Sequence, residues 1–248
     1  MAPRNPPPPA RADWAYFLDV DGTLIEIAAT PEAVDIDDSL RALLAQLQSS
    51  CGGALALVTG RALAFIDARL HLPGLCVAAQ HGLEQRDARG QLHLSEAPDS
   101  AKRAIARALA PVLARHPGLL LEDKGLALAL HYRRAPQLAA YAQRLMAQLA
   151  QASGAGLEVQ RGKFVAEIKP AGMDKGSAVT RYLAQPPFRG RRPVYIGDDL
   201  TDERGFAAVN RMQGVSIKVG KGRSCARFRL AEVAAVRRWL RTASTPGE

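Results

Sequence analysis

Short apolar runs alternate with stretches of helical spacing along much of the chain. The run 14–18 ends at Asp19, and the run 54–58 ends at Thr59. Between them, the leucines of 39–48 recur as on one face of a helix. A strand, a helix and a second strand in this order predict a right-handed parallel unit whose strands are buried on both faces.

Three further apolar runs fit the same pattern, at 76–79, 192–196 and 215–219. The residues that follow such strands lie together at one edge of a parallel sheet, where ligands bind. The five runs therefore predict an α/β fold with a doubly wound, Rossmann-like parallel sheet as its core.

The middle of the chain follows a different pattern. Apolar residues have helical spacing over 102–115 and 136–151, and they alternate with polar residues over 126–132 and 163–169. Alternation is typical of strands with one buried face. These four segments predict a small antiparallel sheet with helices on one face.

The two patterns together predict the domain organisation. We expect a core made of residues 14–96 and 170–248, with an α+β cap inserted at 97–169. Residues 1–13 are rich in proline, so we expect them to be disordered.

The composition is that of a globular protein, with 48% hydrophobic and 23% charged residues among 248, which excludes global disorder. The net charge of +9 and the dense basic run at 218–241 suggest, as an alternative class, a nucleic-acid-binding module. Aromatic residues make up only 5% of the chain, so the interleaved aromatics of single-strand binders are missing. We interpret the run as solvated surface and expect no nucleic-acid partner.

The cysteines and the hydropathy of the chain indicate in which cellular compartment the protein is expected. Cys51, Cys76 and Cys225 are too few and too far apart for a disulfide framework or a zinc site. No apolar run approaches the roughly 20 residues of a membrane span, and the N-terminus lacks the apolar core of a signal peptide. We therefore expect a cytoplasmic protein with no membrane partner.

An aspartate pair follows the first predicted strand. Asp19 and Asp21 are two residues apart, and Gly22 permits a sharp turn after them. One carboxylate could then act as a nucleophile while the other donates a proton.

Further carboxylates, Asp198, Asp199 and Asp202, follow the strand at 192–196. Clustered carboxylates repel one another unless a cation lies among them, and oxygen ligands of this kind favour Mg²⁺. Thr59 offers a hydroxyl group at the end of the second strand, and Lys175 could neutralise a phosphoryl group.

The order of the motifs DVDGT, TGR, DKG and GDDLTDE resembles that of the haloacid-dehalogenase-type phosphatases, and the insertion resembles the cap of their sugar phosphatases. Within this group the chain is similar to the trehalose-6-phosphate phosphatases over nearly its whole length. The similarity lies in residues 17–24, 80–84, 125–133, 164–170 and 197–203. GDDLTDE combined with HYR and EIKP is specific, whereas DxD or TGR alone is not.

The resemblance implies a Mg²⁺-dependent phosphatase that works through an aspartyl-phosphate. Asp19 attacks phosphorus, and Asp21 protonates the departing sugar oxygen and then activates water. Thr59 binds a phosphoryl oxygen, and Lys175 offsets its charge. The implied metal ligands are Asp19, Asp198 and the main-chain carbonyl of Asp21, with Asp199 and Asp202 supporting them.

The resemblance also implies that Glu122, Lys124 and Glu167 of the cap contact sugar hydroxyls. Glu122 and Lys124 fall on one side of an extended chain, and the alternation at 163–169 puts Glu167 on the face opposite Phe164. The predicted substrate-binding residues are completed by Gly60, Arg61 and His81.

The implied substrate is trehalose 6-phosphate, with a functional link to the trehalose-6-phosphate synthase that makes it. Two alternatives stay open within the same superfamily: a phosphatase for another sugar phosphate, such as sucrose phosphate, and a phosphosugar mutase. A mutase has to retain and return its phosphoryl group, whereas Asp21 in this position favours rapid hydrolysis.

Overall fold

The computed structural model describes residues 6–27, 34, 36–95, 99–154, 156–162 and 164–244. The chain divides into two compact units, each with its own hydrophobic core. The larger unit comprises Met1–His93 with Asp174–Glu248, and the smaller unit comprises Leu94–Met173. The segment expected to form a cap, 97–169, falls inside the smaller unit.

A mixed sheet forms the centre of the larger unit. Its strands are β1 (Ala15–Leu18), β2 (Leu55–Val58), β3 (Cys76–Ala79), β4 (Glu84–Arg86), β5 (Leu92–Leu94), β10 (Pro193–Gly197), β11 (Val215–Val219) and β12 (Phe228–Leu230). They lie in the order β12-β11-β10-β1-β2-β3-β4-β5. Neighbours from β12 to β3 are parallel, whereas β4 is antiparallel to β3. The predicted doubly wound sheet is confirmed.

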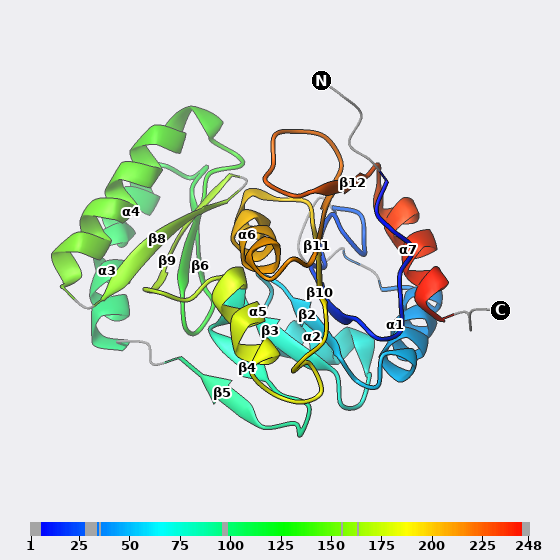
Figure 1. Ribbon diagram of the computed structural model, residues 1–248. Helices are drawn as coiled ribbons and strands as arrows, with labels where there is room; N and C mark the ends of the chain where they lie inside the picture. The colour runs from blue at the N-terminus through cyan, green and yellow to red at the C-terminus, as the bar shows by residue number, and fades with distance from the viewer. Residues whose placement is uncertain are drawn as a thin grey trace. The chain divides into compact units, whose positions relative to one another are not determined.

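Helices cover both faces of this sheet. They are α1 (Asp38–Ser50), α2 (Leu63–Leu70), α5 (Lys175–Leu183), α6 (Glu203–Arg211) and α7 (Val233–Arg241), with short 3-10 turns η1 (Gln80–Gly82), η3 (Leu200–Asp202) and η4 (Thr242–Ser244). Helices α1 and α7 pack together on one side of the sheet, and α5 and α6 pack together on the other (Figure 1). Because both faces are covered, every residue of β1, β2, β3, β10 and β11 is buried.

The smaller unit is an antiparallel sheet with helices on one face. Its elements are α3 (Asp99–Arg115), β6 (Leu120–Asp123), β7 (Leu128–His131), η2 (Pro136–Leu138), α4 (Ala139–Ser153), β8 (Leu157–Gly162) and β9 (Val165–Pro170). The strand order is β6-β7-β9-β8. Leu109 of α3, Met146 of α4 and Ile168 of β9 belong to one buried cluster, so the helices cover the apolar face of the sheet, as the alternation predicts.

The predicted strand 163–169 needs two corrections. Phe164 lies just before β9 with a φ of 63° and is 37% exposed, so it does not join the apolar face. The polar face is less exposed than the alternation indicates, because Glu167 and Lys169 are both buried. Lys169 donates to Glu158 Oε1 at 2.6 Å and also to the carbonyl of Met173, so its charge is neutralised within the smaller unit. Lys163 lies outside the described residues.

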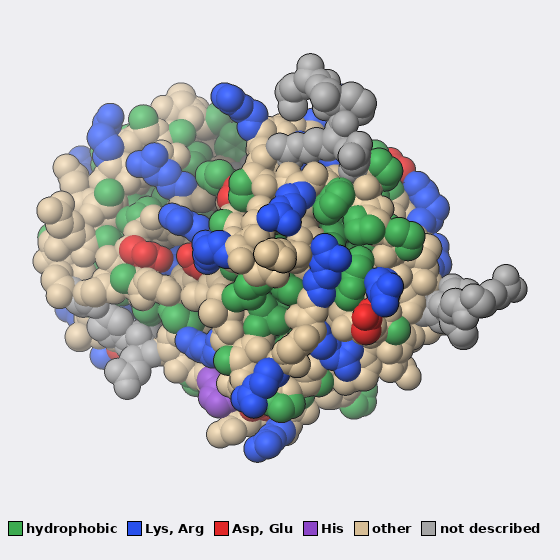
Figure 2. Space-filling model, in the orientation of Figure 1, with side chains coloured by type: hydrophobic (Ala, Val, Ile, Leu, Met, Phe, Trp, Pro, Cys, Tyr) green, Lys and Arg blue, Asp and Glu red, His purple; other side chains and the backbone are tan. Residues whose placement is uncertain are grey.

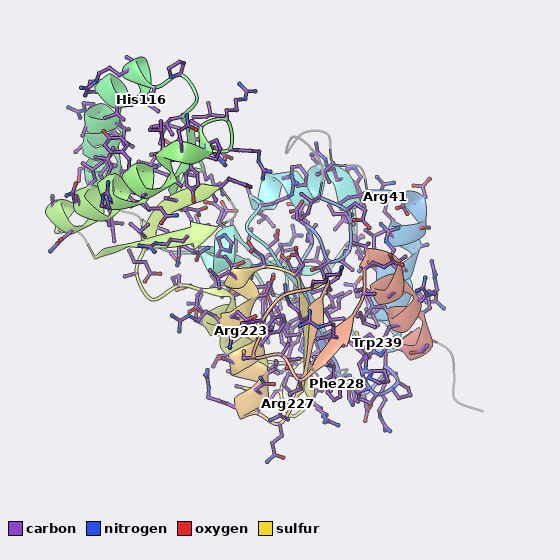
Figure 3. The ribbon with its side chains drawn as sticks, turned by 90° about the horizontal axis from the view of Figure 1, so that it is seen from above. Arg41, His116, Arg223, Arg227, Phe228 and Trp239 are labelled. Carbon is purple, nitrogen blue, oxygen red and sulfur yellow. The ribbon has the colours of Figure 1, made fainter. Side chains whose placement is uncertain are left out.

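The expectation that residues 1–13 are disordered is wrong for 6–13. The indole Nε1 of Trp239, labelled on α7 in Figure 3, donates to the carbonyl of Pro8 at 2.9 Å. The backbone N–H of Ala10 donates to Thr242 Oγ1 at 3.3 Å, and the Ala10 side chain is buried. Proline restricts the unfolded chain, so a proline-rich segment with such partners loses little entropy on ordering. Residues 1–5 lie outside the described residues.

The basic run 218–241 is only partly solvated surface. Lys218 is buried, and Arg237 donates Nε–H to the carbonyl of Leu24 at 2.8 Å and Nη1–H to Asp37 Oδ2 at 2.6 Å. Other basic residues of the run, including Arg223 and Arg227 in Figure 3, lie outside α7 on the segment that leads to β12. Figure 2 shows Lys and Arg side chains dispersed among uncharged ones over the larger unit. The described residues therefore form no continuous basic stripe on that face.

Arg237→Gln is expected to destabilise the protein by about 1 kcal/mol, because it removes the ion pair with Asp37 and the bond to Leu24, and Asp37 is partly exposed to screening by solvent. The hydrogen bond from Ser39 and the contact with Arg237 lower the pKa of Asp37. The stability from that carboxylate is therefore present above its unfolded pKa of about 4 and is lost at lower pH. Urea unfolding measures the difference, with Arg238→Gln on the exposed face of α7 as the matched control. Equal stability of the two variants at neutral pH would contradict a stabilising role for the contacts of Arg237.

Two further sequence observations are clarified by the fold. Among the described residues, no helix is long and apolar enough to cross a membrane. Cys51 and Cys76 are buried, and Cys225 is exposed.

Candidate active site

Three neighbouring strands of the larger unit bring the predicted catalytic residues to one edge of the sheet. Strands β10, β1 and β2 are adjacent and parallel, and the residues that follow them are Asp198, Asp19 and Thr59. The carboxyl ends of parallel strands open onto the crevice where ligands bind in such folds. Residues far apart in the sequence therefore meet because of the strand order.

A buried lysine joins two of the carboxylates. Lys175 Nζ, at the start of α5, donates to Asp19 Oδ1 at 2.8 Å and to Asp202 Oδ1 at 2.7 Å. The side chains of the three residues are 6% exposed or less. Helix α5 begins at Lys175 because the preceding Asp174 caps it, accepting from the N–H of Ser177 at 2.8 Å. The cap fixes where the chain turns and so fixes the ammonium group between the two carboxylates.

Asp202 organises the loop after β10. Its Oδ1 also accepts from the Tyr195 hydroxyl at 2.8 Å, and its Oδ2 accepts from the backbone N–H groups of Asp198 at 3.0 Å and Asp199 at 2.9 Å. Both oxygens are therefore already engaged by the protein. This residue holds the loop in the shape that presents Asp198.

The electrostatics of the cluster follow from burial and crowding. Burial and then repulsion by Asp202 raise the pKa of Asp19 well above its ordinary value. Burial, Asp202 and Asp199 raise the pKa of Asp198 to about 6. Burial alone lowers the pKa of Lys175, but attraction to Asp19 and Asp202 outweighs it, so the net shift is upward. The cluster holds more negative charge than Lys175 alone offsets.

The donor set fits a hard divalent cation. Carboxylate oxygens of Asp19, Asp198 and Asp202 lie within 4.8 Å of one another. The carboxylate of Asp198 lies against the backbone of Gly22, where φ is 73° and a Cβ would come within 2.3 Å of Asp198 Oδ2. Only glycine fits this close approach, which keeps the Asp198 oxygens beside the first strand. Asp19 and Asp198 are the residues best placed to hold a divalent metal ion.

The side chains of the other two predicted metal residues have different partners. Asp199 caps η3, accepting from the N–H of Leu200 at 2.7 Å, and lies outside the cluster. Asp21 is held by Arg61, whose Nε and Nη2 atoms lie 2.6 Å from Asp21 Oδ2 and Oδ1. Arg61, predicted to bind substrate, therefore contacts the predicted proton donor in this structure.

The TGR segment lies where a phosphoryl group is expected. Thr59 is buried, and its Oγ1 accepts from the backbone N–H of Arg61 at 3.1 Å, which leaves its hydroxyl hydrogen to donate. The buried ring of His81 packs on Gly60, where a Cβ would lie 2.8 Å from ring atoms. The His81 N–H also donates to the carbonyl of Thr59 at 2.8 Å. His81 therefore supports the backbone of this segment.

The predicted sugar-binding residues lie on the polar face of the smaller unit. Glu122 pairs in register with Ala129, and Ala129 pairs with Glu167, so both glutamates are on one face with an alanine between them. Lys124 Nζ donates to Glu167 Oε2 at 2.9 Å. Glu167 Oε1 is buried and has no hydrogen-bond partner within the described part of the chain. Glu122 Oε2 lies 2.7 Å from His131 Nε2.

Sequence reasoning missed two residues of this site. Lys218 of β11 donates its ammonium group to the main-chain carbonyl of Asp198, although the sequence places it in a basic surface run. Tyr195 of β10 reaches Asp202 from inside the sheet. A lysine inside the apolar run 215–219 was the one available signal, because a buried strand rarely carries a charge without a partner.

The chain has the fold of the haloacid-dehalogenase-type phosphatases, with carboxylates at the ends of β1 and β10. A solved phosphatase of the haloalkanoate dehalogenase superfamily, from Bacteroides thetaiotaomicron, shares this fold with a TM-score of 0.59 at 19% identity, covering 91% of this chain and 92% of its own. At that identity the likeness concerns the fold alone.

The family is shown by sequence. The model of the trehalose-phosphatase family matches residues 17–234. The trehalose-6-phosphate phosphatase of Escherichia coli (strain K12) is 43% identical over 247 residues, which cover 98% of this chain and 91% of that protein. The C-terminal domain of the Candida albicans trehalose-6-phosphate phosphatase has a TM-score of 0.82 at 24% identity, covering 95% of this chain and 92% of that one. The chain belongs to the trehalose-phosphatase family.

Proposed function

We propose that this protein is a Mg²⁺-dependent phosphatase that hydrolyses trehalose 6-phosphate to trehalose and inorganic phosphate through an aspartyl-phosphate. The observation that carries the proposal is the contact of buried Lys175 with Asp19 at the end of β1, beside Asp198 at the end of the adjacent strand β10, in a chain of this family. A nucleophilic carboxylate, a fixed cation and further oxygen ligands are what phosphoryl transfer requires.

The reaction has two displacement steps. An oxygen of Asp19 attacks phosphorus, the bond from phosphorus to the sugar oxygen breaks, and Asp21 gives its proton to that oxygen. A water molecule then attacks phosphorus, Asp21 takes a proton from the water, and the bond from phosphorus to Asp19 breaks. Lys175 stays beside Asp19 and offsets negative charge in both steps, while the hydroxyl group of Thr59 donates to a phosphoryl oxygen.

The metal has a defined place in this proposal. Asp19 and Asp198, with the main-chain carbonyl of Asp21, would hold Mg²⁺, and Asp202 orients the loop that carries Asp198. When bound, the ion neutralises charge on the phosphoryl oxygens. Burial and then repulsion by Asp202 and Asp199 raise the pKa of Asp198, and a cation would relieve that repulsion.

The unpaired oxygen of Glu167 is evidence for a substrate with several hydroxyl groups. A buried oxygen acceptor without a donor costs about 1–3 kcal/mol, and a sugar hydroxyl supplies the missing donor to Oε1. Lys124 keeps Oε2 of the same carboxylate in place, and Glu122 lies on the same face. We assign the binding of disaccharide hydroxyls to this face. The functional link to a trehalose-6-phosphate synthase and the cytoplasmic location are predictions that accompany the proposal.

The test is phosphate release from trehalose 6-phosphate, sucrose 6-phosphate, glucose 6-phosphate and 4-nitrophenyl phosphate, each with Mg²⁺ and with excess chelator. We expect the highest kcat/KM on trehalose 6-phosphate and loss of activity with chelator. Glu167→Gln is expected to lower kcat/KM about tenfold on trehalose 6-phosphate and to leave 4-nitrophenyl phosphate unaffected, since that substrate lacks the sugar.

Glu232→Gln, an exposed change of the same kind, is the control for the glutamate variant. A higher kcat/KM on another sugar phosphate would overturn the assignment of trehalose 6-phosphate as the substrate. Full turnover with excess chelator would overturn the proposed dependence on Mg²⁺. Phosphoryl transfer between sugars without release of phosphate would favour a mutase.

A further inference from the structure

We infer that Arg61 is a positioning residue for Asp21, fixing the direction in which this carboxylate exchanges protons with the sugar oxygen and with water. The inference rests on the proposed function and deepens it. It replaces the expectation that Arg61 binds the substrate with a role that acts through Asp21.

The contact between the two side chains is bidentate. Arg61 Nε and Nη2 meet the two oxygens of Asp21, each at 2.6 Å. Paired N–H donors of one guanidinium fit one carboxylate in a single plane, so the contact fixes both torsion angles of the aspartate. The Asp21 side chain is 33% exposed, and without this contact the solvent would leave it free to rotate.

Arg61 is itself held on several sides. Its backbone N–H donates to Thr59 Oγ1 at 3.1 Å, and its carbonyl accepts from the N–H of Gln80 at 2.9 Å. The guanidinium carbon lies 4.0 Å from the centre of the Phe65 ring on α2, a distance typical of a cation–π contact. The side chain is 14% exposed. Asp21 is therefore tied through Arg61 to β2, η1 and α2, which are fixed parts of the larger unit.

The contact leaves Asp21 able to react. A carboxylate has about four acceptor positions, and the bidentate contact uses two of them. The two that remain point away from Arg61, so one of them can carry the proton that passes to the departing sugar oxygen and can later accept a proton from water. The contact uses two of the five N–H donors of Arg61, including its single Nε–H, and so aligns the plane of the guanidinium with Asp21.

The leaving group of the substrate provides the test. The sugar alkoxide needs a proton as it departs, whereas 4-nitrophenolate departs without one, and kcat/KM reports only the steps through the first irreversible phosphoryl transfer. Arg61→Gln is expected to lower kcat/KM about 100-fold on trehalose 6-phosphate and less than about threefold on 4-nitrophenyl phosphate. Arg61→Lys should recover only part of the loss, because an ammonium group cannot make the bidentate contact.

A double-mutant cycle with Asp21→Asn isolates the contact. If Arg61 acts only through Asp21, adding Arg61→Gln to Asp21→Asn should change kcat/KM on trehalose 6-phosphate by less than about twofold. Arg89→Gln, an exposed change of the same kind in the same unit, is the control and should match the wild type on both substrates.

Each outcome decides the inference. Selective loss on the sugar phosphate together with a non-additive cycle supports it. Equal loss on both substrates, or a further large loss in the Asp21→Asn background, would overturn it and assign Arg61 to phosphate binding or to the fold. A wild-type protein that releases phosphate from neither substrate would overturn the proposed function as well, so the two failures are distinguishable.

Discussion

Asp19→Asn is expected to lower kcat on trehalose 6-phosphate by at least about 10⁴-fold, the largest effect of any single change in this chain. The asparagine keeps the shape and can still contact Lys175, but its neutral amide oxygen is a poor nucleophile toward phosphorus. The measurement is phosphate release at saturating substrate and Mg²⁺, with Asp19→Ala assayed in parallel. Asp38→Asn on the exposed first turn of α1 is the matched control.

Trapping the aspartyl-phosphate tests directly whether Asp19 is the nucleophile. The wild type, quenched in acid during turnover, should carry phosphate bound through a carboxylate, and Asp19→Asn should carry none. Turnover within tenfold of the wild type in both Asp19 variants would show that another residue attacks phosphorus.

Lys175→Met is expected to destabilise the protein by about 3–5 kcal/mol, besides lowering activity, because it leaves the carboxylates of Asp19 and Asp202 buried without their shared cation. Urea unfolding measures the loss, with Lys221→Met at an exposed position as the matched control. Added Mg²⁺ should restore part of the stability, because the ion supplies positive charge to the same cluster.

The free energy of unfolding of the Lys175→Met variant is also expected to change with pH. Burial raises the pKa of Asp19, so the folded variant binds protons more readily than the unfolded chain. Stability should therefore rise as the pH falls toward about 4 and should decline as the pH rises through the folded pKa. If the loss of unfolding free energy in Lys175→Met were constant with pH, or equally large in Lys221→Met, this would contradict the role given to Lys175.

The sequence predicted those parts of the site that follow from strand ends. Asp19, Thr59 and Asp198 each come directly after a buried apolar run, and a parallel sheet brings such ends to one edge. The helix start at Lys175 was also predictable, because Asp174 is a strong capping residue. Local patterns sufficed here because each residue's place depends on where its own element begins or ends.

The remaining contacts could not be predicted in this way. Arg61 and Asp21 are 40 residues apart, and their contact depends on the side-chain conformations at the ends of two strands. Lys218 resembles a surface lysine until the position of β11 beside β10 brings it to Asp198. The order in residues 6–13 depends on α7, at the opposite end of the chain. In each case the deciding partner is set by the tertiary packing of distant segments.

The contacts of residues 6–13 with α7 and η4 bring two segments from opposite ends of the sequence together in the larger unit. The bonds from Trp239 to Pro8 and from Ala10 to Thr242 hold the start of the described chain beside its end. A linker could therefore connect the segment at Pro8 to the segment at Thr242, and new chain ends could open in an exposed turn such as the one at Gly90 without interrupting a strand of the central sheet. The same contacts mean that a chemical label attached near Pro8 would lie beside α7 and η4 and would report on the packing of these elements.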